Sequence, residues 1–96
     1  MKHRVIVDQP VVAFIAQWGL SRSAIVRLYT QLHQELGNEA ARFQSTRNPE
    51  EPDLYFHYRI KVASGDHWHQ FDFAVNDTTA PEAVFVEAVS HSSWPW

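Results

Sequence analysis

Hydrophobic and polar residues alternate strictly in the middle of the chain. From Leu54 to Val62 every second residue is apolar, and the positions between carry Tyr, His, Arg and Lys. Strict alternation with aromatic and β-branched residues predicts a β-strand that has one buried and one exposed face. The exposed face of this strand carries His57, Arg59 and Lys61, and we expect the function to reside there.

The N-terminal third shows helical periodicity instead. Residues 4–7 predict a short strand, and Pro10 suits the first position of a helix after the capping residues 8–9. A first helix ends at Gly19, and a second begins after the capping residue Ser21 and ends with a left-handed cap at Gly37. The short break between them predicts an antiparallel helical hairpin. The apolar stripes are Val11, Phe14, Ile15 and Trp18 on the first helix, and Ile25, Leu28, Leu32 and Leu36 on the second.

After the helices, residues 40–45 are compatible with either a helix extension or a short edge strand, and 48–53 predict a loop. The turn signal at Gly65-Asp66 predicts a hairpin between the central strand and a third strand over 67–75. We expect a turn at 76–81, a last strand over 83–90 and an aromatic tail. A two-residue turn predicts the pairs Val62 with His69, Ile60 with Phe71, Tyr58 with Phe73, Phe56 with Val75, Arg59 with Asp72 and Lys61 with Gln70.

This order of elements predicts a single α+β domain over residues 1–96. An N-terminal strand and an antiparallel helical hairpin precede a mostly antiparallel sheet of three to four strands, with the helices grouped on one side. The first strand must join the later sheet, beside the last strand or at an edge.

Composition and charge narrow the possible functions. The chain has no cysteine, which excludes disulfides and cysteine-ligated zinc, and we expect no cofactor. The first apolar run is too short for a signal peptide, and no run suits a membrane span, so we expect a cytoplasmic protein without membrane contact. The net charge is −3, yet residues 1–47 carry six Lys/Arg against three acids, and no Lys or Arg follows Lys61.

Two interpretations of the exposed strand face stay open. Arg59 and Lys61 beside His57 can cradle a phosphodiester and stabilise charge that develops on phosphorus. Alternatively, they form an ordinary solvated face on which Arg59 pairs with Asp72 across the strands.

The other histidines and the terminal tryptophans also have alternative roles. His67 and His69 share a strand face, which suits either a metal or a plain histidine pair at the hairpin tip; with no third ligand in view, we expect no metal. His91 directly follows the last predicted strand and is a candidate general acid or base if that strand lies near Arg59. Trp94 and Trp96 either pack over the core, stack on a base or remain disordered, and we expect at least one to pack.

The order of elements and several short strings resemble the RelE/ParE toxin superfamily of bacterial type II toxin–antitoxin systems. Residues 58–62 (YRIKV) resemble the family's basic central strand, Asp77 lies in the following turn, and 84–91 (VFVEAVSH) resemble its final strand with a terminal histidine.

The resemblance implies a growth-regulating toxin that cleaves mRNA on the ribosome, an endoribonuclease that a cognate antitoxin protein neutralises. It assigns charge stabilisation to Arg59 and Lys61 and acid/base chemistry to His91; His57 joins the catalytic candidates from its place on the same face. We expect the antitoxin to lie across the helical hairpin or the sheet face, at Arg22, Arg27 and Arg59. The alternative is a non-catalytic member of the same fold that acts by protein binding, either a gyrase-inhibitor-like protein or a degenerate toxin.

Overall fold

The computed structural model describes residues 4–39, 50, 55–77 and 83–95. Within these described ranges, two helices and four strands form an α+β fold, as the sequence predicted. The predictions for residues 40–45, for most of the 48–53 and 76–81 segments, and for Leu54 and Trp96 lie outside the described residues. The elements are β1 (Arg4–Val7), α1 (Gln9–Ala16), α2 (Arg22–Glu39), β2 (Phe56–Ser64), β3 (His67–Asn76) and β4 (Ala83–Pro95).

The four strands form one sheet in the order β1-β4-β3-β2. β1 pairs in parallel with β4, as a neighbour of the last strand at the sheet edge, whereas β4 with β3 and β3 with β2 pair antiparallel. The sheet is therefore mixed, which corrects the prediction of a mostly antiparallel one. The parallel pair is possible because the intervening helices and strands return the chain to the end of the sheet where β1 began.

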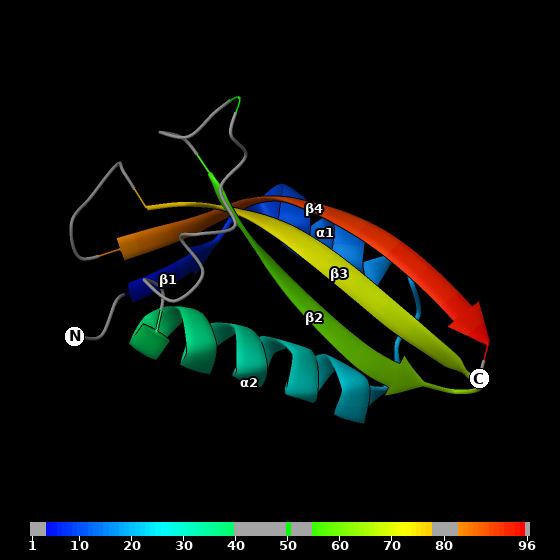
Figure 1. The fold of residues 1–96 in the computed structure, drawn as a ribbon. Helices are drawn as coiled ribbons and strands as arrows, with labels where there is room; N and C mark the ends of the chain where they lie inside the picture. Colours follow the sequence, from blue (N-terminus) through cyan, green and yellow to red (C-terminus); the bar gives the residue numbers. More distant parts are fainter. Residues whose placement is uncertain (1–3, 40–49, 51–54, 78–82, 96) are drawn as a thin grey trace.

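Both helices pack against one face of the sheet. Figure 1 shows α1 behind β3 and β4 and α2 below β2, with the two helices running in opposite general directions. The core combines one stripe of each helix with the alternate residues of β2, β3 and β4. On α2, Leu28, Leu32 and Leu36 are fully buried as predicted. The remaining core residues are Val11, Ile15, Ala24, Phe56, Tyr58, Ile60, Val62, Phe71, Phe73, Val75, Val84 and Val86.

The ends of the helices follow the sequence at two positions and depart from it at two. α1 ends at Ala16, before the predicted end at Gly19, and Gly19 lies in the following break at a φ of +59°, which a residue without Cβ adopts at no steric cost. The Ser21 hydroxyl caps α2 by accepting the Ala24 N–H at 3.2 Å. Pro10 lies in the first turn of α1. The predicted left-handed cap at Gly37 is wrong, because α2 continues to Glu39.

The register of the central hairpin agrees with the prediction in every pair. Gly65, at a φ of +63°, permits the two-residue turn, and the turn fixes which residues lie opposite one another. The side chains of β2 alternate between buried and exposed from Phe56 to Val62. His57, Arg59 and Lys61 therefore lie on the face that the helices leave uncovered, here called the open face.

A bulge changes the alternation of β4. Ala74 lies opposite Ala88 and Val75 opposite Val86, so Glu87 is an extra residue without a partner in β3. An extra residue moves all later side chains to the other face of the sheet. Before the bulge Val84 and Val86 face the core, and after it Val89 does.

Candidate site on the open face of the sheet

Asp72 is the centre of the charged groups on the open face. It lies on β3, opposite Arg59 of β2 and Ser90 of β4. The Arg59 Nη2 donates a hydrogen bond to Asp72 Oδ2 at 3.2 Å. On the other side of the carboxylate, His57 Nδ1 lies 3.9 Å from Oδ1. Two of the predicted catalytic residues therefore meet at one carboxylate, as the cross-strand alternative for Arg59 also required.

These side chains are accessible to a large ligand. Arg59 exposes 64 % of its side chain, His57 46 % and Asp72 30 %. A guanidinium carries five N–H donors, so its single bond to Asp72 leaves donors for an anion. The imidazole of His57 carries ring nitrogens that can accept or donate a proton. The arrangement suits binding and proton transfer at a phosphate ester.

A cleft of about 220 Å³ opens beside this carboxylate. Asp72 lines this cleft, and its Oδ1 atom is buried and makes no hydrogen bond. The cleft exists because the side chains of Ala74 and Ala88, which lie opposite one another on β3 and β4, are too small to fill it. The cleft is lined by His57, Asp72, Ala74, Ala88, Val89 and Ser90.

Ser90, Asp72 and His57 do not form a nucleophilic triad. In such a triad the histidine lies between the serine and the acid and removes the serine proton. Here the register places the acid in the middle, because Asp72 on β3 separates β4 from β2. The open face is therefore not arranged for acyl transfer by Ser90.

Lys61, the third predicted residue of this face, lies toward the hairpin tip. Its Nζ is 4.9 Å from the centre of the Trp68 ring, a cation–π contact. Trp68 in turn lies opposite Trp94 of β4, which is 36 % exposed. Toward the hairpin tip, the open face therefore carries the indole rings of Trp68 and Trp94 next to Lys61. Indole rings are groups that stack on nucleic acid bases.

His91, the fourth predicted catalytic residue, lies on the other face of the sheet. It is opposite Phe71, which is fully buried, and it stacks on Trp18 with ring centres 3.7 Å apart. The structure therefore separates His91 from His57, Arg59 and Lys61. The physical reason is the bulge at Glu87, which reverses the alternation before His91 is reached.

His91 instead meets His69 beneath the sheet. His69 Nδ1 and His91 Nε2 are 3.0 Å apart, so one ring nitrogen donates a hydrogen and the other accepts it. Partial burial and the neighbouring histidine lower the pKa of both rings, and for His69 that neighbour is His67. His67 itself lies 2.7 Å from Asp66, whose pKa falls through this contact. Among the described residues no three His, Cys, Asp or Glu side chains are grouped to hold a metal.

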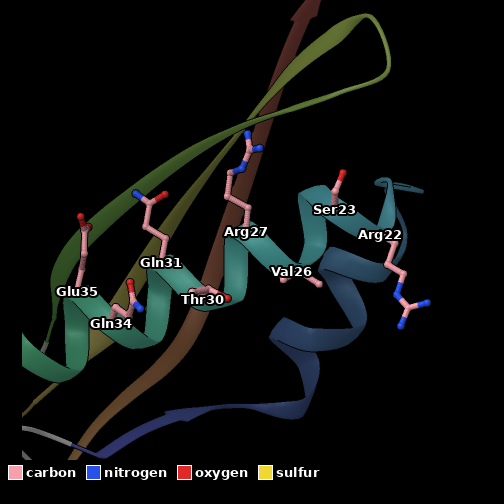
Figure 2. A pocket seen from close by; sticks show the side chains of 8 residues that line it. All are labelled: Arg22, Ser23, Val26, Arg27, Thr30, Gln31, Gln34 and Glu35. Atoms are coloured by element: carbon pink, nitrogen blue, oxygen red, sulfur yellow. The ribbon is translucent and has the colours of Figure 1, made fainter.

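A second concave surface runs along the exposed side of α2. It encloses about 850 Å³, and the lining residues that the structure describes all lie on this helix. Figure 2 shows Arg27, Gln31 and Glu35 in a row along one side of α2. Val26 is 57 % exposed in this groove. The lining residues are Arg22, Ser23, Val26, Arg27, Thr30, Gln31, Gln34 and Glu35.

The sequence missed the groups that β4 supplies. Alternation placed His57, Arg59 and Lys61 on one face, and the hairpin turn placed Asp72 beside them. Ser90, Ala88 and Trp94 join that face only through the pairing of β3 with β4, which no local signal specified. The run Ala88-Val89-Ser90 indicates only that small residues alternate with a larger one.

Comparison of the sequence with protein-family models, with curated proteins and with solved structures finds no match. Within the described residues, neither helix combines the length and apolar character that a membrane crossing requires.

Proposed function

We propose that this chain is a RelE/ParE-like toxin that cleaves mRNA on the ribosome, with its reaction site on the open face of the sheet. The observation that carries the proposal is the meeting of His57 and Arg59 at Asp72, on an uncovered face beside a cleft. The strand–helix–helix–sheet order adds support, because the resemblance in the central and last strands rests on the same order.

The chemistry assigned to the site is transfer of the phosphoryl group to a neighbouring hydroxyl. His57 takes the proton of the ribose 2′-hydroxyl, whose oxygen bonds to the adjacent phosphorus. The bond from phosphorus to the 5′-oxygen breaks, which leaves a 2′,3′-cyclic phosphate and a 5′-hydroxyl that takes its proton from solvent. Arg59 and Lys61 stabilise the negative charge on the phosphoryl oxygens. Asp72 orients Arg59 through its hydrogen bond, lies 3.9 Å from His57, and takes no part in bond making.

The proposed partner is an antitoxin segment that binds in the groove along α2. Arg22 and Arg27 give one part of the groove positive charge, and Val26 offers an exposed apolar contact. A helix or extended segment with an acidic and an apolar side matches both features. Binding there leaves the open face of the sheet accessible, so neutralisation by steric block requires the antitoxin to reach Arg59 as well.

A non-catalytic, protein-binding function is the second candidate. The separation of His91 from Arg59 and Lys61 favours it, because the resemblance assigns acid/base chemistry to that terminal histidine. A protein that binds through charged faces keeps its activity without a proton-transferring group.

Controlled expression of the chain alone in a bacterial cell tests the proposal, with growth and mRNA 5′ ends as the readouts. We expect growth arrest and new 5′ ends in translated messages. Both are lost in Arg59→Ala/Lys61→Ala and in His57→Ala, and both persist in His91→Gln. The matched control is Arg22→Ala/Arg27→Ala, which removes two cations from α2 and none from the open face.

The other outcomes decide between the candidates. Arrest without new ends, insensitive to His57→Ala, supports the protein-binding function. Absence of any effect from abundant, folded protein overturns both. Cleavage that is lost in His91→Gln, with the fold intact by circular dichroism, moves the reaction site to the helix-covered face.

A further inference from the structure

The buried Oδ1 atom of Asp72 has no hydrogen-bond partner. Buried polar atoms in proteins are nearly always paired, and an unpaired carboxylate oxygen is costly. Its neighbour Oδ2 is already occupied by Arg59. His57 Nδ1 lies 3.9 Å from Oδ1, which is beyond hydrogen-bond distance. Oδ1 is therefore an acceptor without a donor. Because it is buried while the Asp72 side chain is 30 % exposed, a rotation of the carboxylate must expose Oδ1 before a ligand in the cleft can use it.

The space beside Oδ1 limits what that ligand can be. The cleft encloses about 220 Å³. Pockets that enclose a whole small molecule measure about 300–1,000 Å³, so this one admits a single ring system and leaves the rest of the ligand outside. Ala74 and Ala88 give the cleft apolar walls, and Ser90 adds a hydroxyl to its lining. A flat heterocycle with a hydrogen-bond donor on its edge fits these features.

We infer that this cleft binds a nucleobase that carries an exocyclic amino group, and that the amino group donates a hydrogen bond to Asp72 Oδ1. Adenine, cytosine and guanine have such a donor, and carboxylates accept hydrogen bonds from base amino groups in known protein contacts. Uracil has no amino group. Its one edge donor, the ring N3–H, is flanked by two carbonyl oxygens, so a carboxylate oxygen that accepts from it is repelled by an acceptor on each side. The inference rests on the proposed function only in taking RNA as the source of the base.

The hydrogen bond from Arg59 to Asp72 predicts how the substitution Asp72→Asn changes the cleft. In Asp72→Asn the amide oxygen is the atom that can accept from Arg59, so the amide NH₂ turns into the cleft. The cleft then offers a donor in place of an acceptor. The preference should change from bases with an amino group toward uracil, whose carbonyls accept.

The test measures binding of short 2′-O-methyl RNA oligonucleotides, which the proposed reaction cannot cleave. Oligo(A) is compared with oligo(U), and with an oligomer of purine riboside, which lacks only the amino group of adenine. We expect wild-type protein to bind oligo(A) about tenfold more tightly than the purine riboside oligomer, the factor that one hydrogen bond to a charged acceptor supplies. Asp72→Asn abolishes or reverses this order.

The control variant is Asp66→Asn, which removes the same charge from the hairpin turn outside the cleft and should keep the wild-type order. Equal binding of all oligomers by wild-type protein, or an unchanged order in Asp72→Asn, overturns the inference and leaves the proposed RNA function standing. Failure to bind any oligomer, while expression of the chain still produces new mRNA 5′ ends, overturns the inference alone; failure in both experiments overturns the proposed function as well. Adenosine monophosphate is included as a probe, and binding of it as tight as that of oligo(A) overturns RNA as the source of the base.

Discussion

His69 and His91 share a single hydrogen bond beneath the sheet, with Nδ1 of the first 3.0 Å from Nε2 of the second. The bond holds only while one of the two facing nitrogens lacks a hydrogen, so two charged imidazolium rings cannot keep it. Trp18 covers His91 on the side of α1, and His67 lies beyond His69 with ring centres 6.3 Å apart. This histidine cluster connects the ends of β3 and β4 to the end of α1.

The cluster predicts that stability falls as the pH is lowered. The folded state lowers the pKa of His69 and His91 below the ordinary value of 6.5, chiefly by burial, so the unfolded chain takes up protons first. The loss of stability therefore begins as the pH falls toward 6.5, and it is complete below the pKa values that His69 and His91 have in the folded state. Urea unfolding across roughly pH 7.5 to 5.5 measures it, before carboxylates contribute.

The double variant His69→Gln/His91→Gln should flatten this dependence, because glutamine does not titrate. His33→Gln is the matched control: His33 lies on the exposed side of α2, away from the cluster, and its loss should leave the slope unchanged. An equal slope in wild-type protein and in the double variant contradicts the prediction.

Trp18 should contribute to stability although it is 40 % exposed. It stacks on His91 and also contacts Phe14 edge-on, with ring centres 5.8 Å apart. Aromatic pairs add about 0.5–1.5 kcal/mol beyond burial, so Trp18→Leu should lower the free energy of unfolding by about 1 kcal/mol. Trp94→Leu, at a similarly exposed tryptophan on the open face, should change it by less than about 0.5 kcal/mol. Equal losses in the two variants argue against a role for the stacking.

The hydroxyl of Tyr58 ties the central strand to α2. Tyr58 is 2 % exposed and donates a hydrogen bond to the carboxylate of Glu35. Tyr58→Phe removes the donor and should lower the free energy of unfolding by about 1–2 kcal/mol, as for other bonds to charged groups. Tyr55→Phe is the comparison, because Tyr55 donates to Glu87 at 3.1 Å from a less buried position. A larger loss in Tyr55→Phe reverses the expected order of the two bonds.

The buried stripe of α2 should dominate the stability of the helix layer. Leu32 is fully buried, so Leu32→Ala should cost about 2–5 kcal/mol through lost transfer energy and the cavity left behind. Val26, on the opposite side of the same helix, is 57 % exposed, and Val26→Ala should change stability by no more than about 0.5 kcal/mol. Chemical denaturation of the two variants measures the contrast; similar values in both would contradict the assigned helix orientation.

The sequence by itself determined the elements that rest on local periodicity. Alternation from Phe56 to Val62 and the turn at Gly65-Asp66 set the central hairpin, because a two-residue turn leaves one register in which apolar residues meet. The same rules placed His57, Arg59 and Lys61 on one face with Asp72 opposite Arg59. The spacing of the helix stripes predicted five of the buried residues, namely Val11, Ile15, Leu28, Leu32 and Leu36. Of the other predicted stripe residues, Phe14 and Ile25 are half-buried and Trp18 is exposed. The continuation of α2 past Gly37 to Glu39 was not predicted.

Tertiary structure alone decided what β4 contributes to each face. The residues between β3 and β4 carry no two-residue turn signal, so the sequence leaves the register of these strands unspecified, and the bulge at Glu87 then reverses the alternation. Val84 and Val86 by simple alternation predict that His91 faces the open side. The extra residue instead turns His91 beneath the sheet, toward His69 and Trp18, and brings Ser90 beside Asp72. The single extra residue Glu87 thus places His91 on the opposite face of the sheet from His57, because side chains on a strand alternate between the two faces with a period of two.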